Sequence, residues 1–249
     1  MPIIEKLFHQ LGKYFIFIGS MFVNRERFKI YPRLVVDECV LIGIDSVFIV
    51  AVVSLFIGAV TCVQAAANLV SPLVPVYVVG TVVRDMEVLE LAPTITCVVL
   101  AGKVGSSIAG NLGTMRITEQ IDALEVIGIN SSSYLVLPKI IAAMLTFPLL
   151  VSISGYLGLL GGYLAGDITG AVPGEEYIFG IRNGFKPMNV TLAIVKSIVF
   201  AFLISSISAF QGYFTKGGAL EVGKSSTTAV TNSCIAVLVS DYLLAKLFI

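Results

Sequence analysis

A few polar residues interrupt an otherwise apolar chain, and these are the ones that could do chemistry. Gln64 lies near the end of one apolar segment, and Glu90 stands a few residues inside the next. An ionisable side chain within a membrane span is costly and usually faces the bundle interior or a wet cavity. A turn at Pro72 would bring both to similar depth. We therefore expect Gln64 and Glu90 to lie near one cavity.

Lys196 is the only charged residue in a later apolar segment. It could balance Glu90, meet a phosphate, or extend its long stem to the membrane surface. A purely structural alternative pairs Glu90 with Arg84 or Lys196. Both readings stay open at the level of sequence.

Cysteine and histidine are placed in a way that predicts no metal site and no catalytic triad. Cys39, Cys62, Cys97 and Cys234 are widely spaced and form no C-x-x-C pair, and His9 is the only histidine. We expect the cysteines to act as small buried apolar residues.

Composition places the chain in the membrane class. Of its 249 residues, 57% are hydrophobic and 13% are charged, against about 25% charged in soluble domains. Its net charge of zero gives no global field that would favour nucleic acid as a partner. The expected fold is therefore an all-α integral membrane protein.

Uncharged stretches predict about five transmembrane helices within a single transmembrane domain, residues 37–249. Pro72 and Pro75 divide the longest stretch, and 166–187 is a polar loop rich in Gly and Pro. The expected spans are 47–67, 76–104, 140–165, 190–215 and one that begins within 225–240. Gly158, Gly162 and Gly166 predict close helix packing in the third span.

Residues 1–36 mix apolar and basic residues and predict an amphipathic helix in the membrane interface. The apolar positions of this helix are Leu7, Phe8, Leu11, Phe15 and Ile18. A helix packed on a cytosolic partner is the alternative. The segment lacks the compact apolar run and cleavage site of a signal peptide, so internal spans are expected to direct membrane entry.

Basic residues predict the orientation, because cytoplasmic loops carry the excess of Lys and Arg. The larger set comprises Lys6, Lys13, Arg25, Arg27, Lys29, Arg33, Lys103, Arg116, Lys139, Lys216 and Lys224. The smaller set, expected outside, comprises Arg84, Arg182, Lys186 and Lys246. This distribution predicts a cytoplasmic N-terminus.

The connection between spans two and three predicts a contact with a separate protein that supplies the energy for a conformational change. TMRITEQIDALEVIGI, residues 114–129, reads as a short amphipathic helix with Ile117, Ile121 and Leu124 on one face. Glu119 and Asp122 point the other way. An ordinary ordered loop is the plain alternative.

The same stretch resembles the signature of the MlaE permease family. AGKVGS, residues 101–106, leads into MRITEQIDALE, residues 115–125, and similarity continues through 89–107 and 195–213. The sequence departs from the family pattern at Asn111, where an acidic residue is frequent, and at Leu89, where a basic one is.

The resemblance implies a homodimeric, non-catalytic permease subunit of an ABC-type phospholipid transporter in the inner membrane. Its implied partners are a cytoplasmic ABC ATPase that binds the ATP, a periplasmic MCE-domain protein and, in some systems, a STAS-domain subunit; no cofactor is expected in this chain. The implied ATPase contacts are Arg116, Glu119, Gln120, Asp122 and Glu125, and the implied lipid-site residues include Gln64, Glu90 and Leu91.

Two other functions compete with this one. An ion-coupled secondary carrier would use Glu90 as its titrating group, but such folds often show inverted repeats and this sequence shows none. A membrane scaffold without cargo would tolerate any substitution at Gln64 and Glu90.

Overall fold

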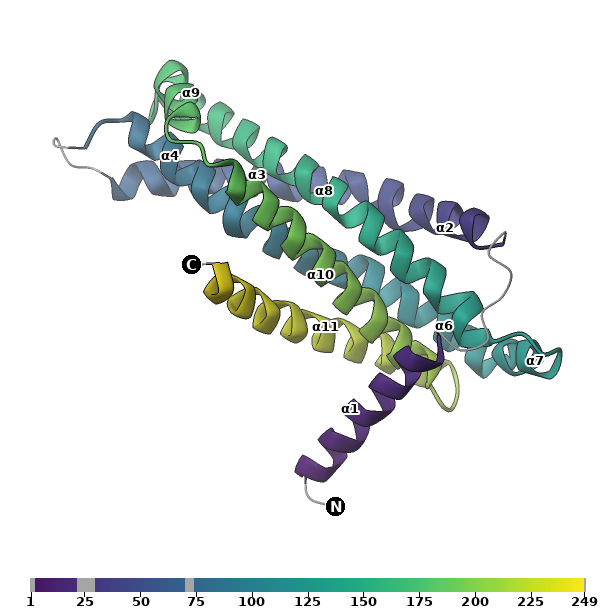
Figure 1. The fold of residues 1–249 in the computed structure, drawn as a ribbon. Helices are drawn as coiled ribbons and strands as arrows, with labels where there is room; N and C mark the ends of the chain where they lie inside the picture. The colour runs from purple at the N-terminus through teal and green to yellow at the C-terminus, as the bar shows by residue number, and fades with distance from the viewer. Residues whose placement is uncertain (1–2, 22–29, 70–73, 249) are drawn as a thin grey trace.

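A computed structural model describes residues 3–21, 30–69 and 74–248. Within these ranges the chain is helical, and no strand occurs. Five long helices form an elongated bundle, and a short N-terminal helix projects from one end of it (Figure 1).

The first two long helices contain several segments each. Tyr31–Asn68 comprises α2 (Tyr31–Cys39), the π-helical turn η1 (Val40–Ile44) and α3 (Asp45–Asn68). The second, Tyr77–Ile117, comprises α4 (Tyr77–Met86), η2 (Glu87–Ile95), α5 (Thr96–Leu100), η3 (Ala101–Gly105) and α6 (Ser106–Ile117). The other three are α8 (Ser131–Thr169), α10 (Pro187–Tyr213) and α11 (Ala219–Phe248).

All five long helices are long and apolar enough to cross a membrane, which confirms the predicted number of spans. The helices extend beyond the predicted limits: the first begins at Tyr31 instead of 47, and the second runs to Ile117 instead of 104. Hydropathy marks the part of a helix inside the bilayer, whereas backbone hydrogen bonding continues into the polar region. The expected boundary between residues 36 and 37 consequently lies within a continuous helix.

Three shorter helices complete the fold: α1 (Ile3–Ser20), α7 (Gln120–Val126) and α9 (Gly174–Arg182). The region of α9 was expected to be a loop, but the helix packs on α4, where Gly80 and Gly180 allow close backbone approach. The buried Tyr177 of α9 donates a hydrogen bond to the Leu159 carbonyl oxygen (3.2 Å). Burial raises the pKa of the Tyr177 hydroxyl, which therefore stays protonated.

The predicted amphipathic helix α1 turns most of its expected apolar face away from the protein. Phe8, Leu11 and Phe15 are exposed, as an interfacial helix requires. Its other face packs on α10: Phe17 is buried, and Tyr14 shares a hydrogen bond with Ser206 (2.7 Å). Residues 22–29, which include part of the predicted N-terminal segment and three basic residues used for orientation, lie outside the described residues.

Glycines bring α3 and α8 into backbone contact, as the glycine pattern of the third span predicted. A Cβ atom on Gly58 would lie 1.8 Å from the carbonyl oxygen of Gly158. One on Gly158 would lie 1.9 Å from a carboxylate oxygen of Glu87, and one on Gly162 would meet the hydroxyl of Tyr177. A side chain at Gly58 would move α3 and α8 apart, whereas one at Gly158 or Gly162 would displace the side chains of Glu87 and Tyr177.

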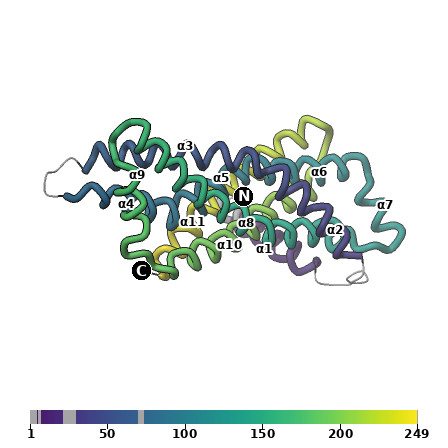
Figure 2. Tube along the Cα trace, turned by 90° about the horizontal axis from the view of Figure 1, so that it is seen from above, coloured from purple at the N-terminus to yellow at the C-terminus, as the bar shows by residue number. Residues whose placement is uncertain are grey.

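The bundle has two different ends. The helices α4 and α9 lie at one end, and α2, α6 and α7 lie at the other (Figures 1 and 2). We call these the α9 end and the α7 end.

Candidate functional site

A buried cluster of charges lies in the half of the bundle nearer the α9 end. The Lys196 ammonium, fully buried, lies 3.0 Å from the carboxylate of Glu90 and 2.7 Å from that of Asp241. It also donates a hydrogen bond to the Leu89 carbonyl oxygen (2.9 Å). Three long helices therefore meet at one cation, because Glu90 belongs to η2, Lys196 to α10 and Asp241 to α11.

Glu90 is the accessible member of the cluster. Half of its side chain is exposed, against 15% for Asp241 and none for Lys196. One lysine serves two carboxylates, so the cluster carries one more negative than positive charge. The pairing of Lys196 with Glu90 was one of the expected alternatives, whereas Arg84 instead binds Asp85 and the carbonyl oxygens of Ile181 and Asn183.

Two acidic residues of this region were not identified from the sequence. Asp241 lies near the C-terminal end of α11, where a charge at the membrane edge is ordinary. Glu87 is 1% exposed, and its Oε2 has no hydrogen-bond partner in the described part of the chain. The only sequence signal for Glu87 is that it lies three residues before Glu90 in one predicted span, and this spacing says nothing of Asp241.

Gln64 lies in a separate pocket of about 220 Å³ between α3 and α4. This pocket is lined by Thr61, Gln64, Ala65, Asn68, Leu69, Val82 and Met86. Glu90 is not among these lining residues, and neither is the half-buried Leu91. Within one chain, the expected cavity therefore appears as two adjoining polar sites, with Met86 and Glu90 one turn apart.

At the α7 end, the amphipathic connector is broken into two helices. Helix α6 ends at Ile117, Glu119 adopts a left-handed conformation (φ 60°), and α7 begins at Gln120. Ile121 is fully buried and anchors α7. The segment 114–129, expected as one short helix, is thus the last turn of α6, a sharp corner and the short helix α7.

The five expected ATPase contacts divide into two groups. Arg116 pairs with Asp122 (2.6 Å), and the Glu125 carboxylate accepts hydrogen bonds from Tyr213 (2.9 Å) and Ser131 (2.8 Å). The Arg116–Asp122 pair joins α7 to α6, and the Glu125 hydrogen bonds fix α7 on α10 and α8. Glu119 and Gln120 are exposed at the corner, and Gln120 donates only to the nearby Thr118 hydroxyl (3.0 Å).

Tyr213 also connects α7 with α1. Its ring packs against Phe17 of α1 (5.1 Å between centroids) and Phe214 (5.2 Å), and the Arg116 guanidinium lies 5.9 Å from its centre. A displacement of α7 would therefore be transmitted to α10 and α1 through the Tyr213 side chain.

Residues Gly218–Ser225 read GALEVGKS, which matches the GxxxxGK[ST] spacing of a phosphate-binding loop. A true loop of this kind would contradict the expectation that the partner ATPase, and not this chain, binds the ATP. Such a loop follows a strand and wraps phosphate with free backbone N–H groups. Here Ala219 starts α11, so the second glycine and the lysine are already helical. Lys224 pairs with Glu221 of the same helix (2.6 Å). The match is therefore not a phosphate-binding loop.

Comparison with known proteins agrees with this arrangement. The family model described as "Permease MlaE" matches residues 35–247. A probable ABC transporter permease protein of Rickettsia bellii is 38% identical over 243 residues, which cover 98% of this chain and 93% of the relative. A probable ABC transporter permease protein of Synechocystis is 33% identical and covers 96% and 91%, respectively.

A chloroplast protein of Arabidopsis thaliana named TRIGALACTOSYLDIACYLGLYCEROL 1 is 30% identical over 94% of this chain and 66% of the relative. An ABC transporter permease subunit is not itself catalytic and works with an ATPase partner. Fold, motif and relatives agree: the chain is a multi-pass membrane protein that belongs to the MlaE permease family.

Proposed function

We propose that the chain forms a homodimer that moves phospholipid between the inner membrane and a periplasmic MCE-domain carrier, and so maintains the lipid asymmetry of the outer membrane. The α7 end faces the cytoplasm and its ATPase, and the α9 end faces the periplasm. A STAS-domain subunit is a possible further component.

The observation that carries this proposal is the charge cluster inside apolar helices. A half-exposed carboxylate, Glu90, is held beside a buried lysine at a depth where lipid would otherwise surround it. Such an arrangement suits a lipid molecule, because polar groups meet the head group while apolar helices contact the acyl chains. The Arabidopsis relative is named for a glycerolipid, which supports a lipid as the cargo.

Exposed apolar surface on the first and last spans supports the proposed homodimer. The most apolar windows of the spans Tyr31–Asn68 and Ala219–Phe248 are only 28% and 17% buried. Two copies joined along such surfaces would bring their Gln64 and Glu90 sites toward a common cavity.

The corner at Glu119 supports contact with the ATPase. Glu119 and Gln120 are free to face a partner, Asp122 is exposed, and Arg116 and Glu125 hold α7 in place. Closure of the ATPase would push α7, and the push would reach the cavity along α10.

The decisive experiment purifies the tagged chain in mild detergent, identifies co-purifying proteins and analyses bound lipid by mass spectrometry. The expected result is an ATPase, an MCE-domain protein and enriched phospholipid. A protein that purifies alone and without lipid would contradict the proposal. Lipid transport that persists after deletion of the ATPase would instead favour an ion-coupled carrier.

A further inference from the structure

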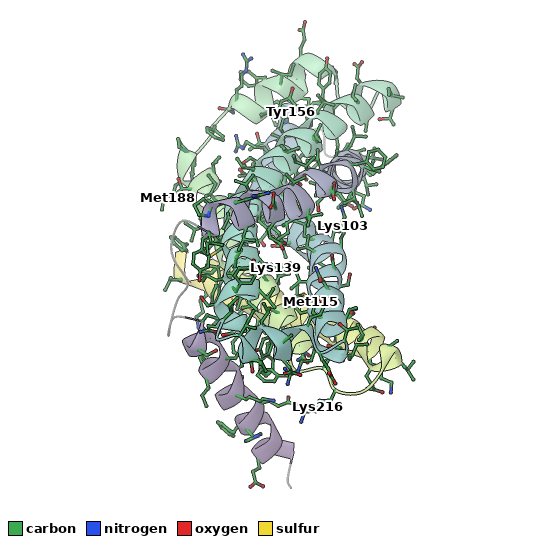
Figure 3. All side chains as sticks on the ribbon, turned by 90° about the vertical axis from the view of Figure 1, so that its right-hand side faces the viewer. Lys103, Met115, Lys139, Tyr156, Met188 and Lys216 are labelled. Atoms are coloured by element: carbon green, nitrogen blue, oxygen red, sulfur yellow. The ribbon has the colours of Figure 1, made fainter. Side chains whose placement is uncertain are left out.

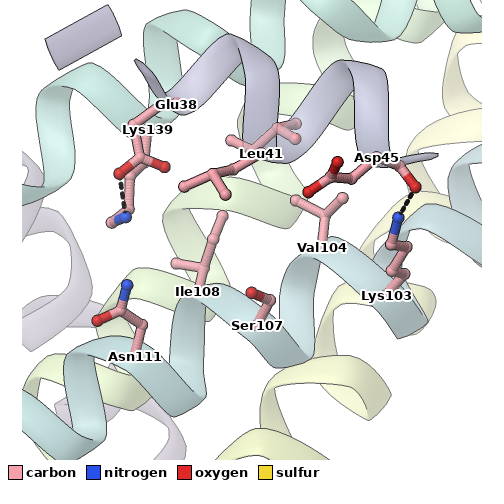
Figure 4. Close-up of a pocket in the computed structure, with 10 residues that line it drawn as sticks. Glu38, Leu41, Asp45, Lys103, Val104, Ser107, Ile108, Asn111 and Lys139 are labelled. Atoms are coloured by element: carbon pink, nitrogen blue, oxygen red, sulfur yellow. Dashed lines mark hydrogen bonds and ion pairs between the residues drawn. The ribbon is translucent and has the colours of Figure 1, made fainter. Parts of the chain in front are cut away.

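A second polar pocket lies at the α7 end, apart from the Glu90 cluster. It has a volume of about 270 Å³ and lies between the first span and the η3–α6 part of the second. The lining residues are Glu38, Leu41, Ile42, Asp45, Lys103, Val104, Ser107, Ile108, Asn111 and Lys139 (Figure 4). Lys103 and Lys139 are also labelled in the end view of Figure 3, near α2.

The charges of this pocket balance. Lys139, 95% buried, is ion-paired with Glu38 at one end, and Lys103 donates a hydrogen bond to the main-chain oxygen of Asp45 at the other. Two lysines and two carboxylates give a formal charge of zero. A neutral group with separated charges therefore fits this pocket better than an anion or a cation.

Three polar side chains of the pocket are available for a ligand. The Asp45 carboxylate, the Ser107 hydroxyl and the Asn111 amide make no hydrogen bond within the described residues. Figure 4 shows all three directed into the space between the two helices. Asp45 offers an acceptor for a cation, and Asn111, near the Lys139 ammonium, offers donors for an anion.

The depth of the pocket matches the head-group layer. No charged residue follows Asp45 in the first span, and the 23 residues from Ser46 to Asn68 form a helix about 35 Å long, slightly more than the hydrocarbon layer of about 30 Å. Asp45 therefore lies at the membrane surface when α3 spans the bilayer. Beside it, Leu41 (58% exposed), Ile44 (66%) and Phe48 (80%) present an apolar surface.

We propose that this pocket binds the zwitterionic head group of a phosphoethanolamine-type lipid from the cytoplasmic leaflet, with the ammonium at Asp45 and the phosphate at Lys139 and Asn111. The acyl chains lie along Ile44 and Phe48. This inference deepens the proposed function and rests on it, since it assigns a second contact site for the same cargo.

The test uses the complete transporter with its ATPase in nanodiscs without ATP. The probes are photoactivatable phosphatidylethanolamine and phosphatidylglycerol with identical acyl chains, and cross-linked peptides are mapped by mass spectrometry. The expected adducts lie in residues 38–45 and 103–111, and ethanolamine lipid labels them about tenfold more strongly, the effect of one charge-assisted hydrogen bond.

Two variants with exposed positions test the named groups without disturbing the core. Asp45→Asn and Asn111→Leu should each lower labelling by the ethanolamine lipid about tenfold. Asp37→Asn is the matched control, because Asp37 is an exposed acid of α2 outside the pocket. Equal labelling by both lipids, or an Asp45→Asn variant that labels like the parent, would overturn the proposal.

A competition separates the two sources of the head group. Soluble glycerophosphoethanolamine should leave the labelling by the lipid probe unchanged. If the soluble compound abolishes the labelling, the pocket binds a water-soluble ligand and the proposed lipid site is wrong. ATP-driven lipid transfer is measured in the same nanodiscs. Transfer without site labelling refutes this inference alone, whereas labelling without transfer refutes the proposed function.

Discussion

A single lysine organises the charges within the spans. Removing one partner from a buried ion pair costs about 3–5 kcal/mol because the remaining charge stays buried and unpaired. Lys196→Met should therefore strongly lower the midpoint temperature of thermal unfolding of the purified protein, since only 15% of the Asp241 side chain is exposed to solvent. The midpoint is measured by the temperature dependence of monodisperse protein in size-exclusion chromatography.

Two further variants give this prediction its controls. Lys186→Met changes the same residue type at an exposed position before α10 and should leave the midpoint unchanged. Lys196→Met with Asp241→Asn should recover part of the loss, because the more buried of the two carboxylates that pair with Lys196 is then neutral. A Lys196→Met variant as stable as the parent would mean that the cluster contributes little to stability.

At the residue scale, sequence identified charges that interrupt an apolar run and missed those at its margins. Lys196 was recognised because it is the only charge in its predicted span, and Glu90 because it lies inside the apolar part of its span, with no further charge before Lys103. Neither Asp241, which lies near a helix end, nor Glu87, which precedes the uncharged part of its span, was singled out from the sequence. Which charges meet depends on how α10 and α11 pack, and no periodicity within one helix contains that information.

At the scale of elements, the contact between α3 and α8 depends on two facing glycines. Gly58→Ala would place a methyl group 1.8 Å from a main-chain oxygen, which no side-chain rotation can relieve. Overpacking typically costs about 1–3 kcal/mol, and a clash with backbone belongs at the upper end of that range. We expect a lower thermal midpoint for Gly58→Ala.

Gly223→Ala is the matched control. Gly223 lies within α11 with no atom near its absent Cβ, so alanine should be neutral or slightly stabilising. Equal midpoints for the two variants would show that α3 and α8 can separate at little cost.

The attachment of α7 gives a second prediction at this scale. Tyr213→Phe removes the hydroxyl that donates to Glu125, and a hydrogen bond to a charged group contributes about 1.5–3 kcal/mol. Backbone amides of residues 120–126 should then exchange with deuterium faster, as measured by mass spectrometry. Tyr242→Phe, at an exposed position of α11, should leave that exchange unchanged.

Elements were predictable in number and order because charge-free stretches are long. Their ends were not, since Tyr31 and Ile117 continue helices through polar sequence. The corner at Glu119 was missed because the apolar spacing of Ile117, Ile121 and Leu124 fits one continuous helix, and a single left-handed residue does not change that spacing. Helix α9 was hidden by the Gly and Pro residues around it.

At the scale of the whole molecule, orientation is the property most open to test. In a cysteine-free background, Ala123→Cys reports on α7 and Glu176→Cys on α9, both at exposed positions. A membrane-impermeant maleimide should label Glu176→Cys on spheroplasts, and Ala123→Cys only after permeabilisation. The reverse labelling pattern would mean that the molecule has the opposite orientation in the membrane, with the Asp45 pocket in the outer leaflet.

The π-helical turns have a consequence for how the molecule changes shape. A π turn holds more residues than an α turn, and such turns are frequent at functional sites. The turns η1 and η3 border the Asp45 pocket, and η2 contains Glu90. Tightening one of them by a residue would rotate the rest of its span by about 100°, the angle between successive residues of an α-helix. Such a tightening would exchange the side chains that the span presents to each pocket by a screw motion, with no hinge.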